Sequence, residues 1–129
     1  MSKPLYQKLG IKPEHRVALV NVPSAYLEWL DCDFSLNETE PLYDFVHIFS
    51  DTKADLETWI KEYKGLIEQD GMIWISWPKK SSKVPTDIIE DTIRDIVLPM
   101  GLVDVKVCSV SDIWSALKVV IRKELRTKT

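Results

Sequence analysis

The feature that most constrains the fold is a run of apolar and small residues, Met72–Trp77, which lies between Gly71 and Pro78. A run of this length, bounded by a glycine and a proline, is typical of a strand buried on both faces. Similar runs occur at Arg16–Val22 and Tyr43–Ser50. Because such strands need cover on both faces, the sequence predicts a three-layer α/β domain.

Helical patterns fill the segments between these runs. Apolar residues recur three and four positions apart over residues 51–69 and again over 86–98, which predicts two amphipathic helices. Shorter helices are expected at 4–9 and at 23–30, where Pro23 is tolerated in a first turn. A short strand is expected at 32–36.

The end of the chain favours a β-hairpin. Two β-rich runs, 102–110 and 113–123, are separated by Ser111-Asp112, which has the composition of a turn. Strands alternating with helices and followed by this hairpin predict a Rossmann-like domain whose sheet is mostly parallel, with an antiparallel hairpin at its end. We expect the 129 residues to form one domain, with residues 1–14 as an N-terminal extension and 124–129 as a frayed tail.

Composition excludes several classes of protein. The formal net charge of -3 gives no general reason to bind nucleic acid, and no apolar run is long enough to cross a membrane. The two cysteines, Cys32 and Cys108, have no metal-ligand spacing, and the N-terminal segment lacks the apolar core of a signal peptide. We therefore expect a cytoplasmic protein with two free buried thiols and no metal.

The best candidate site is the cationic loop that follows the Met72–Trp77 strand. Ligands of open parallel sheets bind beyond the carboxyl ends of the strands, and ammonium groups beside a helix N-terminus suit a phosphate or a carboxylate. The candidate ligand-binding residues are Trp77, Lys79, Lys80, Ser81, Ser82, Lys83, Thr86 and Asp87. Thr86 or Asp87 is also the expected helix cap, since Asp87 with Glu90 fits a capping box. The alternative is a solvated loop whose lysines face the acidic helix beside them.

The order of elements resembles the C-terminal half of class I methyltransferases. The segments that carry this resemblance are Gly71–Pro78 and Met100–Val107 with the last strand, within residues 40 to 123. The resemblance implies a sheet whose final strand is inserted antiparallel, and it implies an S-adenosylmethionine site after the first strand.

A second resemblance spans nearly the whole chain and is to domain-of-unknown-function family 3052, an uncharacterised bacterial family. The matching segments are Lys8–Pro13, Arg16–Leu19, Trp77–Ser81, Thr86-Asp87, Pro99–Cys108, Trp114-Ser115 and Arg122-Lys123. This resemblance implies no particular activity, because the family has none established.

The turn after the first strand argues against the cofactor that the methyltransferase resemblance implies. Such sites need glycines so that backbone N–H groups can approach the ligand closely. Here the turn reads Asn21-Val-Pro-Ser24, without glycine and with one N–H removed by the proline. We therefore expect no cofactor. Asp31 or Asp33 could serve as a ribose-binding acid, but surface solvation explains both equally well.

Other residues favour structural roles. His47 shares a strand face with Phe45 and Phe49 and is more simply a core histidine, hydrogen-bonded to backbone, than a general base. Cys108 could share a face with Lys106, which would favour a thiolate, but a buried thiol is the simpler reading. Trp74, Trp77 and Trp114 could form an aromatic platform with the lysine loop at its rim, but ordinary core packing is the simpler interpretation.

These observations favour a non-catalytic binding or regulatory domain with an anion-recognition loop and no catalytic residue. One alternative is a reduced methyltransferase-like or phosphate-handling enzyme that uses the same pocket. Another is an interaction scaffold that uses the edge of the hairpin, with a protein partner or a second copy. The expected ligand is small and anionic, a phosphate or a carboxylate.

Overall fold

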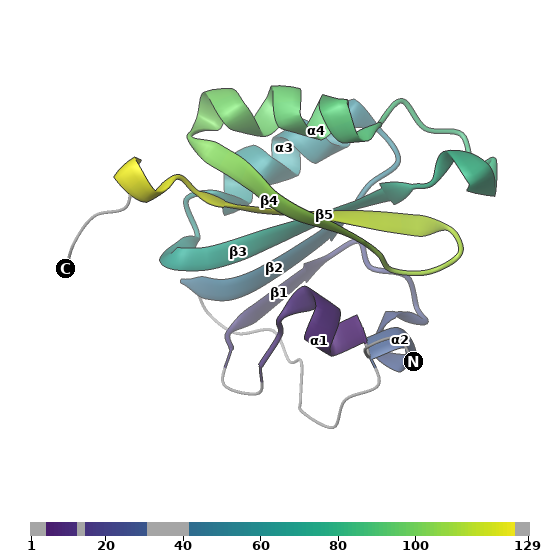
Figure 1. Cartoon of the computed structure of the whole chain (residues 1–129), viewed down its shortest axis with the longest axis horizontal. Coiled ribbons are helices and arrows are strands. Elements are labelled where there is room, and N and C mark those ends of the chain that lie inside the picture. Colours follow the sequence, from purple (N-terminus) through teal and green to yellow (C-terminus); the bar gives the residue numbers. More distant parts are fainter. Residues whose placement is uncertain (1–4, 13–14, 31–41, 126–129) are drawn as a thin grey trace.

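The computed structural model describes residues 5–12, 15–30 and 42–125 (Figure 1). The strands are β1 (Val17–Val20), β2 (Tyr43–Phe49), β3 (Ile67–Pro78), β4 (Leu102–Ser109) and β5 (Trp114–Ile121). The α-helices are α1 (Leu5–Leu9), α2 (Tyr26–Leu30), α3 (Lys53–Tyr63) and α4 (Glu90–Val97). Short 3₁₀ turns lie at Lys80–Ser82, Leu98–Met100 and Lys123–Leu125. The expected strand at 32–36 lies outside the described residues.

The strands form one open sheet in the order β1-β2-β3-β5-β4. β1, β2 and β3 are parallel, whereas β5 runs antiparallel to both of its neighbours, β3 and β4. The predicted α/β class and the C-terminal hairpin are confirmed, but the prediction of a mostly parallel sheet is wrong: the sheet is mixed. The reason is that β5 enters between β3 and β4, so the hairpin adds two antiparallel pairings.

Helices cover both faces of the sheet, as Figure 1 shows, with α3 and α4 on one side and α1 and α2 on the other. Alternation along β2 divides its side chains between two cores. Val46 and Ile48 face α3 and α4, whereas Phe45, His47 and Phe49 face α1 and α2. A strand buried on both faces has no polar side, which explains the continuous apolar runs in the sequence.

The junction between α3 and β3 differs from the prediction. The helix expected to end at Asp70-Gly71 ends at Tyr63, and β3 begins at Ile67, which pairs with Tyr43. Gly71 therefore lies inside a strand and not in a turn. A Cβ at this position would lie 3.0 Å from the carbonyl oxygens of Glu68 and Tyr43, so the close backbone approach at this irregular pairing favours glycine.

Shorter elements follow the predictions more closely. The helices expected at 4–9 and 23–30 are found as α1 and α2. The helix expected to begin near Thr86 begins at Glu90, where the Thr92 hydroxyl accepts a hydrogen bond from the Ile89 N–H. Among the described residues, no helix is both long enough and apolar enough to span a membrane.

Candidate functional site

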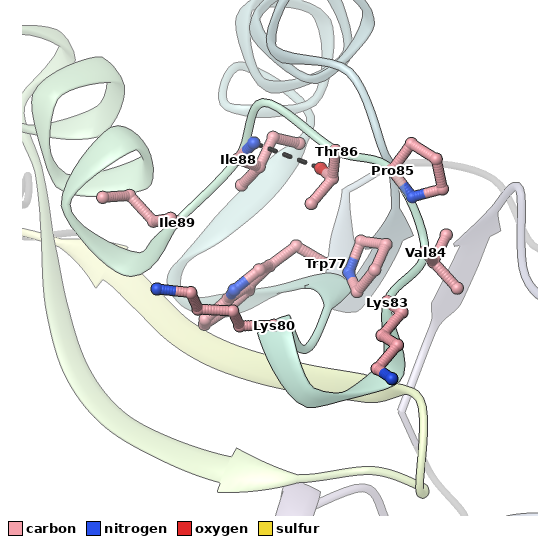
Figure 2. A pocket seen from close by; sticks show the side chains of 9 residues that line it. Trp77, Lys80, Lys83, Val84, Pro85, Thr86, Ile88 and Ile89 are labelled. Carbon is pink, nitrogen blue, oxygen red and sulfur yellow. Dashed lines mark hydrogen bonds between the residues drawn. The ribbon is translucent and has the colours of Figure 1, made fainter.

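A pocket of about 410 Å³ lies where β3 ends (Figure 2). Three consecutive segments build it: the end of β3, the 3₁₀ turn, and the extended segment that leads into α4. Its lining residues are Trp77, Pro78, Lys80, Lys83, Val84, Pro85, Thr86, Ile88 and Ile89. In Figure 2, Lys80 and Ile89 lie on one side of the pocket, and Val84 and Pro85 lie on the other.

Hydrogen bonds within the loop fix its backbone. The Lys79 N–H donates to the Ile113 carbonyl at 2.6 Å, which attaches the loop to the hairpin. The Ser82 hydroxyl donates to the Lys79 carbonyl at 2.6 Å and accepts from the Val84 N–H at 3.2 Å. Lys83 then takes a left-handed conformation, with φ 62°, which ends the turn. A side chain at positive φ carries a small conformational cost, so surrounding contacts must hold this geometry.

The predicted site residues separate into two groups. Trp77, Lys80, Lys83 and Thr86 line the pocket together. The Thr86 hydroxyl donates to the Asp51 carbonyl at 2.7 Å and accepts from the Ile88 N–H at 3.1 Å, so it fixes the pocket wall. The two ammonium groups are therefore the charged groups of the pocket lining.

The remaining predicted site residues do not line this pocket. The Lys79 ammonium donates to the Ser109 hydroxyl at 2.6 Å. Ser81 is exposed, and the Ser82 hydroxyl is bonded within the loop. The Asp87 carboxylate accepts a hydrogen bond from the Lys53 N–H at 2.7 Å and so caps α3. The prediction that Asp87 caps the following helix is wrong, because the chain brings Asp87 beside the start of α3 instead.

The sequence reasoning missed the apolar part of the pocket. Val84 and Pro85 belong to no predicted site, and Ile88 and Ile89, which fall within the predicted helix 86–98, precede α4. Ile88 is buried in the core, whereas the Ile89 side chain is 61% exposed. The exposed Ile89 precedes the first turn of α4. Pro85 could have indicated that this segment is extended, because a proline disfavours helical backbone at the residue before it.

Glu90 and Asp91 at the start of α4 pair with Arg94, whereas Lys80 and Lys83 are exposed, so the alternative of a solvated loop stays a prediction. Arg94 bridges Asp104, Glu90 and Asp91. Hydrogen bonds to Asp104 and then to Glu90 raise the pKa of Arg94 above its ordinary value. Among the described residues, the ion pairs belong to Arg94 or to Lys61, and none involves a lysine of the loop.

The turn after β1 uses its polar groups within the protein. Asn21 has a positive φ of 56°, and its side-chain amide donates to the Phe49 carbonyl at 3.1 Å. This bond joins the carboxyl ends of β1 and β2, the position where a doubly wound sheet would open a crevice for a ligand. Asp31 and Asp33, the candidate ribose-binding acids, lie outside the described residues.

His47 is fully buried and belongs to a polar network. Its Nδ1 is hydrogen-bonded to the Tyr26 hydroxyl at 2.8 Å and its Nε2 to the Ser76 hydroxyl at 2.7 Å. The predicted core location is confirmed, but its partners are side chains and not backbone groups. Burial lowers the pKa of His47 to about 3, so the ring is neutral in the folded protein.

The tryptophans do not form one cluster. Trp77 packs in the core beneath α3 and α4, whereas Trp74 and Trp114 belong to the core on the opposite face. The Trp74 indole N–H donates to the Leu9 carbonyl at 2.8 Å, which holds α1 against the sheet. Cys108 is half-buried on that same face, and burial raises the pKa of its thiol. No group of three or more potential metal ligands lies within the described ranges.

Comparison with solved structures shows a methyltransferase-like α/β fold. The magnesium protoporphyrin IX methyltransferase of Synechocystis matches with a TM-score of 0.51 and 16% identity, over 69% of this chain and 45% of that one. The Bacillus subtilis M1A22 tRNA methyltransferase TrmK matches with a TM-score of 0.54 and 11% identity, over 95% and 67%. The PH0226 protein of Pyrococcus horikoshii matches with a TM-score of 0.51 and 8% identity, over 92% and 75%.

These likenesses describe the fold, since all three identities are low. The chain spans less than half the length of the first of these methyltransferases. No protein-family model and no curated protein sequence matches the chain, so the resemblance to domain-of-unknown-function family 3052 is not confirmed.

Proposed function

We propose that this protein is a non-catalytic binding domain that recognises a small anion in the pocket at the end of β3. The observation that carries the proposal is the composition of the pocket lining. Lys80 and Lys83 contribute positive charge without an ion-pair partner among the described residues, and Pro85 and Ile89 contribute accessible apolar surface. An apolar wall with a few convergent polar groups is the usual composition of a small-molecule site.

The pocket supports a particular kind of anion. About 410 Å³ is within the range of small-molecule sites and exceeds what one inorganic anion needs. The Lys80 and Lys83 nitrogens lie at different ends of the pocket (Figure 2). A ligand with an apolar body against Val84 and Pro85, and a carboxylate or a phosphate near one of these ammonium groups, would use both parts of the lining. Because the loop backbone is hydrogen-bonded on both sides of Lys80, little ordering would accompany binding.

A methyltransferase-like enzyme is the alternative, and the fold similarity to methyltransferases favours it. That function requires S-adenosylmethionine. The glycine-free turn after β1, whose Asn21 side chain is bonded to Phe49, argues against the usual site. Calorimetry with S-adenosylmethionine and S-adenosylhomocysteine distinguishes the two functions, because micromolar binding of either compound would favour the enzyme.

The proposal is tested by a thermal-shift screen of small carboxylates and phosphate esters. A ligand at 100 times its Kd stabilises the fold by about 2.7 kcal/mol, which raises the Tm by several degrees. The test variant is Lys80→Ala/Lys83→Ala. Its control is Lys12→Ala/Lys64→Ala, which removes the same charge from two exposed positions outside this pocket.

A shift that is lost in the pocket variant and kept in the control would support the proposal. A shift that persists in Lys80→Ala/Lys83→Ala would place the ligand elsewhere. If no compound raises the Tm, the small-anion function is wrong for the classes screened.

A further inference from the structure

Two lysines lie directly opposite each other on the face of the sheet that α1 covers. Lys106 of β4 and Lys118 of β5 are register partners, and Lys118 is in turn the partner of Trp74 on β3. Trp74 belongs to the core under α1, so both lysines project to that face. Directly opposite residues of an antiparallel pair have Cβ atoms about 5 Å apart, which brings two like charges together.

This pairing is unfavourable in the free protein. Like charges directly opposite each other destabilise a sheet. Burial and then the charge of Lys106 lower the pKa of Lys118 from its ordinary value. Among the described residues, the cations that form ion pairs are Lys61 and Arg94. No described carboxylate therefore forms an ion pair with Lys106 or Lys118.

A third lysine comes from another element. The positive charges of Lys106 and of Lys8, on α1, both act to lower the pKa of the Cys108 thiol, although burial has the larger and opposite effect. Cys108 pairs with Ala116 two residues along from the Lys106 position, on the same face. The charges of Lys8 and Lys106 therefore both act on this half-buried thiol, and Lys118 is the register partner of Lys106 on the same face.

We propose that Lys8, Lys106 and Lys118 form a binding site for the phosphate group of a small ligand. Ammonium groups on three separate elements can each donate to a different oxygen of one phosphate, and a bound dianion offsets the repulsion between the paired lysines. The site is independent of the proposed pocket at Trp77, since Trp77 lies in the core on the opposite face of the sheet.

The charges favour a small ligand over a nucleic acid. Protein surfaces that bind nucleic acids present an extended basic patch, whereas this cluster is local and belongs to a chain of net charge -3 with 20 acidic residues. One phosphate group matches the size of the cluster.

Alkylation of Cys108 reports on the site directly. In a Cys32→Ser variant, Cys108 is the remaining thiol of the chain. A phosphate bound beside it raises the thiol pKa and covers the sulfur, so inorganic phosphate and pyrophosphate should slow its reaction with iodoacetamide saturably. Sodium chloride of the same ionic strength is the control for screening.

Lys106→Gln and Lys118→Gln, made separately, should each raise the Kd from this assay about tenfold, because one charge-assisted hydrogen bond is lost. Lys80→Ala/Lys83→Ala should leave it unchanged. The site is refuted if phosphate slows alkylation no more than chloride does, or if the Kd is unchanged in both glutamine variants. If phosphate fails to slow alkylation only in Lys80→Ala/Lys83→Ala, the phosphate binds in the pocket at the end of β3 and not at the lysine cluster.

The same variants separate binding from a structural role. Lys106→Gln relieves the repulsion, so it should raise the Tm of the free protein by about 2 °C while it weakens phosphate binding. A lower Tm would mean that Lys106 stabilises the fold, which contradicts the inference. A short DNA duplex provides a further arm, and if it protects Cys108 at lower concentration than pyrophosphate does, the small-ligand assignment is wrong.

Discussion

Replacing His47 with glutamine is expected to make the free energy of unfolding less dependent on pH. The imidazole is fully buried and bonded to Tyr26 and Ser76. Burial lowers its pKa from 6.5 to about 3. The unfolded chain therefore binds a proton at mildly acidic pH while the folded protein does not, so acid favours unfolding.

The sign and the size follow from the two pKa values. The stabilising effect of a neutral His47 is complete above pH 6.5, and it is lost as the pH falls from 6.5 toward 3. Between about pH 7.5 and about pH 5, the protonation of His47 in the unfolded chain lowers the free energy of unfolding by about 2 kcal/mol, as the two pKa values require. Carboxylates that titrate in this range do so in both wild type and variant, so their contributions to the change in the free energy of unfolding cancel in the comparison.

Urea unfolding at the two pH values measures the effect. Glutamine retains polar atoms that can reach Tyr26 and Ser76, but it does not titrate. His47→Gln should be less stable than wild type near neutral pH, yet it should lose about 2 kcal/mol less on acidification. NMR of the wild-type ring gives a second measurement, which needs no stable variant. Equal losses in wild type and variant, or a His47 ring that titrates near its ordinary pKa, would refute the reasoning.

Two further predictions concern the backbone. Gly71→Ala should destabilise the protein by about 2 kcal/mol in urea unfolding, because the new Cβ meets the Glu68 and Tyr43 carbonyls at 3.0 Å. Asp87→Ala should cost about 1 kcal/mol, because the Lys53 N–H at the start of α3 loses its acceptor.

Each of these substitutions has a matched control. Gly65→Ala adds a methyl group where no other atom lies within 4 Å, and Asp112→Ala removes an exposed carboxylate from a turn. Both controls should change stability by less than about 0.5 kcal/mol. If Gly71→Ala is as stable as Gly65→Ala, the close approach at the β2–β3 irregularity does not constrain that residue. If Asp87→Ala matches Asp112→Ala, the cap is not stabilising.

The helices and strands with the strongest sequence patterns were predicted best. The run Met72–Trp77 became the centre of β3, and the two β-rich segments after Gly101 became β4 and β5. The end of the helix was wrongly predicted at Asp70, because Leu66 and Ile67 happen to continue the helical spacing of apolar residues. Apolar spacing alone did not reveal that Ile67 pairs with Tyr43 in the sheet.

The position of the cationic loop was predicted, but the residues that line the pocket beside it were not. A cationic loop at the carboxyl end of β3 was expected from the order of strand, lysines and helix, and such a loop is found with its pocket. Which lysines reach that pocket depends on contacts outside the loop. The hairpin holds Lys79 through Ser109, and α3 holds Asp87 through Lys53. Neither partner is near in sequence.

The sequence by itself determined the α/β class, the C-terminal hairpin and the buried place of His47, because apolar runs and helical spacing are local properties of the chain. The order of elements, through its resemblance to methyltransferases, also implied the antiparallel insertion of the last strand beside β3. Only the tertiary structure decided the partners of His47 and the pairing of Lys106 with Lys118. These features depend on which distant segments meet and on which face, and packing of the whole sheet fixes that choice.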